Sequence, residues 1–275
     1  MQFNLDRDDT AENDPLVVQS VVKAFRLLSV FDADRSPLSL TQLSRLLDYD
    51  KSTVQRFAHT LVKLGYLRKD PESKRFEMSV KTLELGHHYI RSNALVDRAM
   101  PSLMQLHRQS QETVNLTILD DTDIVFLARL TSPHMADTRV IIGSRIAAFC
   151  TAPGRAILSR LPRNEAIAIL EASDRRSFTP TTTWLMPELI AKLDLAAELG
   201  YATAFEELFP GDLSIAAPIL NSRGQCVAAV NVSLSRARYK PEQLEKDFTH
   251  ILMAAAHSIS GLSGFRGSPT SQNWK

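Results

Sequence analysis

Apolar residues recur at helical spacing near the start of the chain. Residues 17–31, VVQSVVKAFRLLSVF, place them on one broad stripe, which predicts an amphipathic helix that ends before Pro37. Ser39 can cap a second short helix over 40–47, and Asp50 can cap a third that Gly65 closes. The stripe of the first helix consists of Val18, Val21, Val22, Phe25, Leu27 and Leu28.

The second and third predicted helices lie three residues apart, which is typical of a helix-turn-helix. One side of the third helix is apolar and is expected to pack: Val54, Phe57, Ala58, Leu61 and Leu64. The polar side is free to contact DNA, although polar helix faces commonly meet only water. Arg56 suits guanine and Gln55 adenine, while Ser52 or Thr53 can bind a phosphate near the helix start.

A β-hairpin follows the third helix and favours the DNA interpretation. Strands over 66–68 and 75–78 flank a turn at 70–73, and a hairpin in this position is a wing. Basic side chains at its tip suit phosphate or minor-groove contact. The complete set of expected DNA-binding residues is Ser39, Lys51, Ser52, Thr53, Gln55, Arg56, His59, Lys69, Lys74 and Arg75.

Helical and strand patterns alternate beyond the hairpin. Helices are predicted over 80–91, 95–110 despite Pro101, 153–161, 165–171, 187–199 and 241–262. Strands are predicted over 113–120, 124–130, 138–143, 201–206, 213–220 and 226–234, with a hairpin turn at 221–224. This alternation predicts one mixed α/β sheet with helices on it, and an α+β fold class for the chain.

Charge is concentrated in the first third of the chain. Residues 17–91 hold thirteen basic and eight acidic residues, a net charge of +5, whereas the 275-residue chain carries only +1. The remainder of the chain is therefore net negative. This distribution is expected when only the N-terminal domain binds the phosphate backbone of a nucleic acid.

Other sequence features exclude several classes of protein. No run of about eighteen apolar residues exists and the N-terminal segment is acidic, so we expect a cytoplasmic protein with no membrane partner. Cys150 and Cys226 lack zinc-ligand spacing, and adjacent helical residues such as His87 and His88 point apart. We therefore expect no metal and no other cofactor.

Residues 36–86, from SPLSLTQLSRLLDYDKSTVQRF to TLELG, resemble the DNA-binding domain of the IclR family of bacterial transcriptional regulators. GSRIAAFCTAPGRAIL, GYATAFEELFPGDLSIAAPI and GQCVAAVNVS resemble later parts of that family, so the resemblance spans about residues 17–262. It implies a winged helix-turn-helix domain (17–79), a connector helix (80–94) and a GAF-like effector-binding domain (95–265) between flexible tails (1–16 and 266–275).

The resemblance also implies partners. These are a pseudo-palindromic double-stranded DNA operator, a second copy in a homodimer or homotetramer, and a small organic acid that switches a repressor or activator of a catabolic operon. AAFCTAPGRAIL and NVS look similar to the branch that senses aromatic acids such as protocatechuate or 4-hydroxybenzoate.

An effector pocket is expected where the resemblance brings together residues 149–154, 212–214 and 231–233. A turn entering a helix offers free amides for a carboxylate, and nearby hydroxyls and an amide can orient it. Apolar walls are expected from Ile142, Ile146, Phe149 and Leu127, although Gly154 and the strand serines also suit plain structural roles. The effector-binding residues expected are Phe149, Thr151, Ala152, Pro153, Gly154, Ser214, Asn231 and Ser233.

No catalytic residue is expected. Cys150, with His134 and Asp137, lacks a signature that positions a base, and a free cysteine is commonly a small buried hydrophobe. Glu206 and Glu207 are expected to be structural or to gate the ligand. Two alternatives stay open: an enzyme that uses the GAF-like domain, and an architectural DNA-binding protein whose second domain only oligomerises.

Overall fold

The computed structural model describes residues 14–32, 35–134 and 140–260. The chain divides into two compact units, an N-terminal unit (Met1–Tyr89) and a C-terminal unit (Ile90–Lys275). The division falls inside the connector predicted over 80–94. The predicted flexible tails, 1–16 and 266–275, lie largely or wholly outside the described residues.

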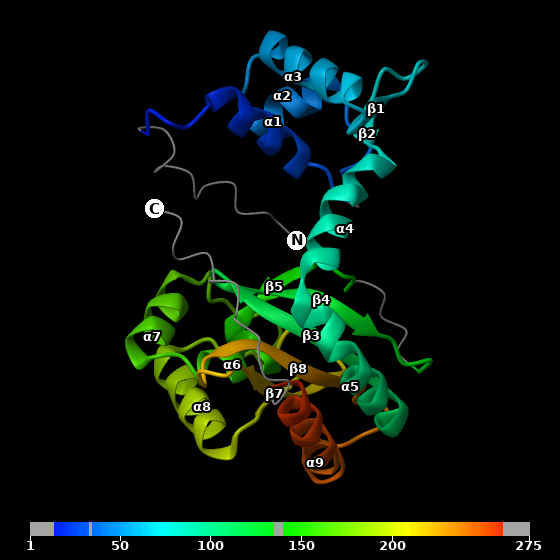
Figure 1. Ribbon diagram of the computed structural model, residues 1–275. Helices are drawn as coiled ribbons and strands as arrows, with labels where there is room; N and C mark the ends of the chain where they lie inside the picture. Colours follow the sequence, from blue (N-terminus) through cyan, green and yellow to red (C-terminus); the bar gives the residue numbers. More distant parts are fainter. Residues whose placement is uncertain (1–13, 33–34, 135–139, 261–275) are drawn as a thin grey trace. The chain divides into compact units, whose positions relative to one another are not determined.

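Three helices and a hairpin make up the N-terminal unit, as the sequence predicts (Figure 1). A short 3-10 turn then leads into a helix that crosses the division between the units. In chain order the elements are α1 (Gln19–Ser29), α2 (Leu40–Leu47), α3 (Lys51–Lys63), β1 (Leu67–Lys69), β2 (Phe76–Met78), η2 (Val80–Thr82) and α4 (Leu83–Ser92).

Local caps fix where these helices begin and end. The Ser39 hydroxyl accepts from the Gln42 amide while the Gln42 side chain accepts from the Ser39 amide, which forms a capping box on α2. The Asp50 carboxylate caps α3 by accepting from the Thr53 amide at 2.9 Å. Gly65 follows α3 with φ +83°, a left-handed conformation that suits glycine.

The apolar stripe predicted for the first helix is only partly buried. Leu27 packs in the core of the N-terminal unit with residues of α2, α3 and the hairpin, but Val18, Val21 and Phe25 are half or more exposed. Leu64, expected on the packed side of the third helix, is exposed as well. The predicted first helix is present, but the packing predicted for Leu64 was wrong, because the apolar stripe is wider than the part of the helix surface that the unit covers.

The C-terminal unit contains one six-stranded sheet between two helical layers. Each predicted helix and every predicted strand except one is present within a few residues. The elements are α5 (Ala94–Ser110), β3 (Thr113–Asp120), β4 (Asp123–Leu130), β5 (Arg145–Ala147), η3 (Ala148–Cys150), α6 (Ala152–Leu158), α7 (Arg163–Ala172), α8 (Met186–Leu199), β6 (Ala202–Phe205), β7 (Asp212–Leu220), β8 (Cys226–Ser235) and α9 (Pro241–Ser260).

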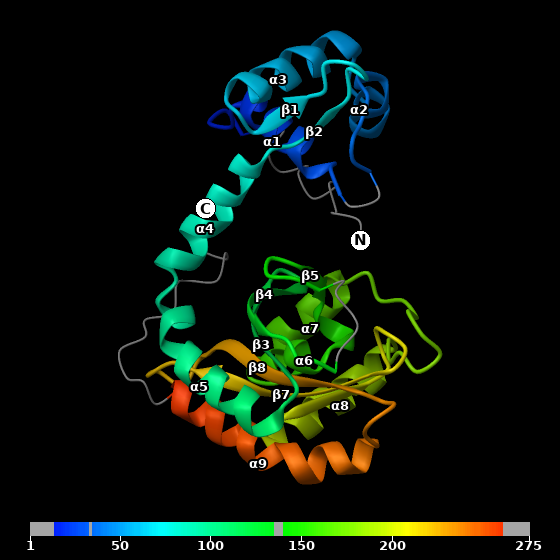
Figure 2. The same cartoon turned by 90° about the vertical axis from the view of Figure 1, so that its right-hand side faces the viewer.

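All neighbouring strands of this sheet are antiparallel, in the order β5-β4-β3-β8-β7-β6. Helices α5 and α9 lie side by side on one face, and α6, α7 and α8 cover the other (Figures 1 and 2). The strand predicted over 138–143 is wrong in its described part, because 140 and 141 have no regular structure, 142–143 form a turn and the strand comes later, at β5. Residues 138 and 139 lie outside the described residues. Gly143 turns the backbone there with φ +86°.

Alternation along the central strands gives the two faces of the sheet different chemistry. On β8, Val230 and Val232 enter the apolar core beneath α5 and α9, while Asn231 and Ser233 point to the other face. The neighbouring strands place Asn115 and Ser214 beside these polar residues. A polar strip therefore crosses the middle of the sheet under α6.

Candidate functional site

Helix α3 presents the polar face that the sequence predicts. Val54, Ala58 and Leu61 are buried, and five polar or charged side chains on the opposite side are exposed. These five are Lys51, Ser52, Gln55, Arg56 and His59. The surface has the residue types that base and phosphate contacts require.

Three of the predicted DNA contacts are engaged at helix caps, Ser39 as the N-cap of α2 and Ser52 and Thr53 as donors to Asp50, the N-cap of α3. Ser52 and Thr53 donate their hydroxyls to the Asp50 carboxylate at 2.8 and 2.6 Å, and Ser39 caps α2. Hydrogen bonds from Thr53, first of all the one from its hydroxyl, hold the pKa of Asp50 far below its ordinary value. The start of α3 therefore carries a fixed negative charge, and a phosphate there has to compete with it for the two hydroxyls.

The wing is ordered by its own side chains. Asp70 accepts from the Ser73 amide and hydroxyl, which closes the turn. Lys74 adopts φ +57° and donates to the Pro71 carbonyl, and Arg75 donates to the Pro37 carbonyl at 3.2 Å. Lys69 lies over the Phe76 ring. All three cations are exposed, so the wing presents positive charge from a defined backbone.

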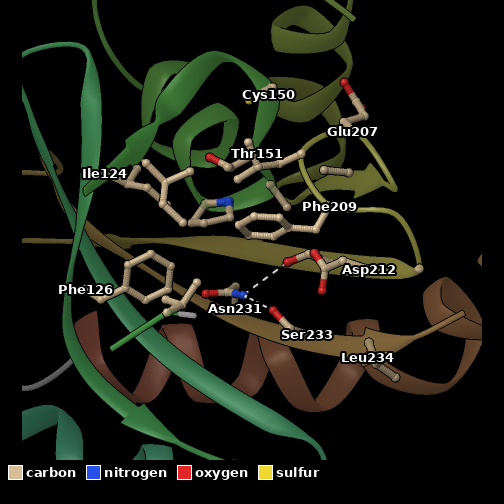
Figure 3. A pocket seen from close by; sticks show the side chains of 18 of the residues that line it. Ile124, Phe126, Cys150, Thr151, Glu207, Phe209, Asp212, Asn231, Ser233 and Leu234 are labelled. Carbon is tan, nitrogen blue, oxygen red and sulfur yellow. Dashed lines mark hydrogen bonds between the residues drawn. The ribbon is translucent and has the colours of Figure 1, made fainter. Parts of the chain in front are cut away.

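The C-terminal unit contains a cavity of about 290 Å³ on the polar face of its sheet (Figure 3). Its walls come from β4, the η3–α6 segment, the β6–β7 loop and the ends of β7 and β8. The volume is near the lower end of that of small-molecule sites. Six of the predicted effector-binding residues line it: Thr151, Ala152, Pro153, Ser214, Asn231 and Ser233.

The other two predicted effector-binding residues do not line the cavity. Phe149 is fully buried and stacks on Phe178, with ring centroids 6.1 Å apart. Gly154 packs so tightly against η3 that a Cβ atom there would lie 2.1 Å from the Ala148 carbonyl oxygen. Glycine at position 154 is therefore explained by close packing, which was the alternative to a role in effector binding.

Only Ile146 of the four predicted apolar walls lines the cavity. Ile142 is exposed, and Leu127 belongs to the core on the opposite side of the sheet. Sequence reasoning missed Ile124, Phe126, Val140, Leu208 and Phe209, which supply the apolar lining instead. The apolar contacts open to a ligand thus come mainly from β4 and the β6–β7 loop.

The free amides predicted at the start of α6 are mostly absent. Thr151 caps the helix by accepting from the Gly154 amide at 3.3 Å, and Pro153 has no N–H. Helix α6 is only seven residues long. A carboxylate at this turn would therefore find fewer donors than the sequence implied.

Asn231 organises the polar floor of the cavity. Its amide nitrogen donates to the hydroxyl oxygens of Ser214 at 3.1 Å and Ser233 at 3.0 Å (Figure 3). Because Ser214, Ser233 and Asn231 lie on adjoining register positions of β7 and β8, the three polar groups meet by strand pairing. The two serines hold Asn231 in place.

Besides Cys150, four ionisable residues line the cavity: Arg129, His134, Glu207 and Asp212. Glu207 is buried against Arg155 of α6, and Lys192 lies 3.4 Å from it. Burial by itself would raise the pKa of Glu207, but the hydrogen bonds and charge of Arg155, the Thr183 amide and Lys192 outweigh it and lower that pKa. Glu207 therefore stays ionised and neutralised, which accords with the structural role expected for it.

Comparison with known proteins identifies the family. A model described as "Bacterial transcriptional regulator IclR C-terminal" matches residues 87–261, and one described as "IclR helix-turn-helix domain" matches residues 20–71. This chain belongs to the IclR family. Together the two matches cover both units, so the IclR family assignment does not depend on the DNA-binding part alone.

Relatives within the IclR family cover nearly the full chain. The "Pca regulon regulatory protein" of Pseudomonas putida is 30% identical over 247 residues, which is 90% of this chain and 84% of the relative. A putative transcriptional regulator from a Rhodococcus species has a solved structure with a TM-score of 0.78 and 35% identity, over 88% of this chain and 97% of that one. An IclR homologue from Microbacterium hydrocarbonoxydans, complexed with 4-hydroxybenzoate, has a TM-score of 0.73 at 22% identity, over 88% and 97% of the two chains.

The IclR family comprises transcriptional regulators, and this chain is a DNA-binding regulator and not an enzyme. The chemistry of Cys150 agrees, because burial raises the pKa of its thiol to about 12 and the thiolate that a nucleophile requires is disfavoured. Among the described residues no group of His, Cys, Asp and Glu is arranged to hold a metal ion. No helix within residues 14–32, 35–134 and 140–260 is long and apolar enough to cross a membrane.

Proposed function

We propose that this regulator binds a pseudo-palindromic operator through the exposed face of α3 and the wing. Basic and polar side chains on one helix, next to an ordered hairpin that exposes Lys69, Lys74 and Arg75, support the proposal. Gln55, Arg56 and His59 are assigned to base edges, and Lys51, Lys69, Lys74 and Arg75 to phosphates. Ser39 caps α2, and the hydroxyls of Ser52 and Thr53 already donate to Asp50, the cap of α3. A phosphate can bind these three hydroxyls only in competition with those contacts. A regulator of this kind works on DNA in the cytoplasm.

The cavity of the C-terminal unit is assigned to a small organic acid. Arg129 lines it, and Glu207 is already neutralised by Arg155, so a carboxylate entering it can meet the Arg129 guanidinium on the side of the lining away from Asp212. Apolar side chains such as Ile124, Phe126 and Phe209 suit a ring or a short hydrocarbon. The named relatives of the Pca regulon and of the 4-hydroxybenzoate complex make an aromatic acid from a catabolic pathway the first candidate.

Self-association is assigned to apolar side chains that are exposed among the described residues. Val18, at the N-cap of α1, lies at helical spacing with Val21 and Phe25, and Leu83 is exposed on α4. A second copy that covers these faces would bring two recognition helices to one operator, which a pseudo-palindrome requires. The assembly is proposed as a homodimer, and a homotetramer would be two such dimers.

One experiment tests the central proposal. The protein is titrated onto a duplex from the region upstream of its own gene and onto scrambled duplex, with and without each acid of a panel of aromatic and short aliphatic carboxylates. We expect tighter binding to the natural duplex, and a change in that affinity with at least one acid. Reciprocity requires the duplex to change the affinity for that acid by the same factor. Absence of any effect of the acids would favour an architectural protein.

A further inference from the structure

The carbonyl groups just beyond α3 are bound by the segment that leads into α4. Backbone carbonyls at the end of a helix have no partner inside the helix, so other groups have to bind them. Leu64, Gly65 and Tyr66 present three consecutive carbonyls directly after α3. All three accept hydrogen bonds from Ser79 or Lys81, which follow the hairpin.

Ser79 makes two of these contacts and Lys81 makes the third. The Ser79 hydroxyl donates to the Gly65 carbonyl, and the Ser79 amide donates to the Tyr66 carbonyl at 2.9 Å. The Lys81 amine donates to the Leu64 carbonyl at 3.0 Å, and its nitrogen lies 5.3 Å from the centre of the Tyr66 ring. A cation at the C-terminal end of a helix also interacts favourably with the helix dipole.

The same two residues build the first turn of the connector. The Ser79 hydroxyl accepts from the Lys81 amide at 3.1 Å, and the Thr82 hydroxyl donates to the Ser79 carbonyl at 2.7 Å. This turn, η2, runs into α4 at Leu83. The stem of Lys81 packs on the backbone after α3, since a Cβ atom at Gly65 would lie 3.3 Å from Lys81 Cδ. The end of α3 and the start of the connector are therefore held together by hydrogen bonds and by packing.

Two elements with different roles meet at this junction. Helix α3 carries the side chains assigned to base edges, and α4 is the helix in which the chain leaves the N-terminal unit. Three hydrogen bonds to consecutive carbonyls fix the position of one element against the other, because a change of angle would break them. The start of the connector and α3 therefore move as one body.

We propose that Ser79 and Lys81 are positioning residues that lock α3 to the connector and thereby set the operator specificity of the regulator. The inference rests on the proposed function, in which α3 reads the operator. Contacts to base edges require a helix that enters the groove in a defined orientation, whereas binding to random DNA depends mainly on charge. The lock should therefore increase affinity for the operator and change affinity for other sequences little.

Titration of the full-length protein onto two duplexes tests the lock. One duplex comes from the region upstream of its own gene, and the other has the same composition in scrambled order. Lys81→Met removes the amine and keeps an unbranched stem against Gly65, and Ser79→Ala removes only the hydroxyl. We expect each variant to lose about three- to tenfold in affinity for the upstream duplex and less than about twofold for the scrambled one, because specific binding then has to order the junction again.

Salt dependence separates the lock from a direct phosphate contact of Lys81, which is exposed. A phosphate contact would reduce the slope of the logarithm of the binding constant against the logarithm of the salt concentration by about one in Lys81→Met. The lock predicts an unchanged slope in this variant, and a similar loss of specificity in Ser79→Ala, which removes no charge. Lys81→Arg keeps a donor and should retain the preference for the upstream duplex.

Arg91→Met is the matched control, because it removes an exposed positive charge from the other end of α4. It should leave the ratio of the two affinities within about twofold of the wild-type value. Thermal unfolding of the same preparations reports whether each variant folds. A lower slope with equal losses on both duplexes in Lys81→Met, or an unchanged ratio in both folded variants, would overturn the lock. A wild-type protein that does not prefer the upstream duplex would overturn the proposed function and the lock with it.

Discussion

Arg155 and Glu207 form a buried bidentate ion pair that joins α6 to the β6–β7 loop. Arg155 Nη1 donates to Glu207 Oε1 at 2.5 Å and Nη2 donates to Oε2, and the two side chains are 1% and 4% exposed. The Thr183 amide donates to the same carboxylate at 2.9 Å. Because both elements carry residues that line the cavity, the pair fixes the distance between two of its walls.

Removing the cation of this pair should destabilise the C-terminal unit. Arg155→Met leaves Glu207 buried and without its main partner, and we expect a loss of about 3–5 kcal/mol in the free energy of unfolding. Urea denaturation measures it. Arg163→Met breaks an ion pair with Asp194 whose side chains are 53% and 58% exposed, and should cost far less because solvent screens that pair. Similar losses in the two variants would refute the role assigned to the buried pair.

Glu207 also makes stability depend on pH. Its pKa in the folded protein is lowered below the ordinary value of 4.5, so its contribution is present above that pH and is lost as the pH falls through the folded pKa. The free energy of unfolding, followed from pH 7 to pH 3, should decrease more steeply in the wild type than in Glu207→Gln, which cannot titrate there. Parallel curves would show that this carboxylate is not responsible.

Two glycine substitutions should have opposite effects. Gly154→Ala drives a methyl group into the backbone of Ala148 and should cost about 1–3 kcal/mol or more, because backbone atoms cannot move aside. Gly86→Ala, within α4, meets nothing within 4 Å and should stabilise the helix by about 0.5–1 kcal/mol. Thermal unfolding of both variants checks the signs. A neutral Gly154→Ala would contradict the close approach of α6 to η3.

Base reading and phosphate binding can be separated on the N-terminal unit. Arg56→Ala should cost about 1–3 kcal/mol on the operator and little on random DNA if it contacts a base. Equal losses of affinity on both duplexes would make Arg56 a phosphate contact.

Lys74→Asn removes a charge from the wing at a left-handed position that asparagine tolerates. The substitution should weaken binding to all DNA sequences alike. It should also reduce the slope of the logarithm of the binding constant against the logarithm of the salt concentration by about one. An unchanged dependence of affinity on salt concentration would exclude the wing from the DNA interface.

The exposed face of α1 should matter for assembly and not for folding. Phe25→Glu places a charge where the second copy is proposed to pack, so sedimentation should show a smaller species at micromolar concentration while the circular dichroism is preserved. Leu195→Glu, on an exposed site of α8, is the matched control and should leave the dimer intact. A wild-type assembly that persists in Phe25→Glu would move the interface elsewhere.

Local chemistry made much of the fold predictable. Ser39 and Asp50 start helices and Gly65 closes one through contacts within a few residues. Spacing along the chain therefore located α2 and α3 and, with them, the exposed polar face that is proposed to bind DNA. Alternation along β8 likewise placed Asn231 and Ser233 together on one face of the sheet. These features depend on neighbours that the sequence itself places side by side.

The lining of the pocket depended on contacts that spacing does not encode. A bulge in β4, between the positions that pair with Leu116 and Thr117, turns both Phe126 and Arg129 to the polar face although they are three residues apart, so strict alternation could not place both. Burial of Leu27 but not Phe25 on α1, and the pairing of Arg155 with Glu207 52 residues away, also follow only from packing. The spacing of polar and apolar residues along the chain predicts which residues share a face. Only the folded chain decides what packs against that face and which polar atoms find a hydrogen-bond partner.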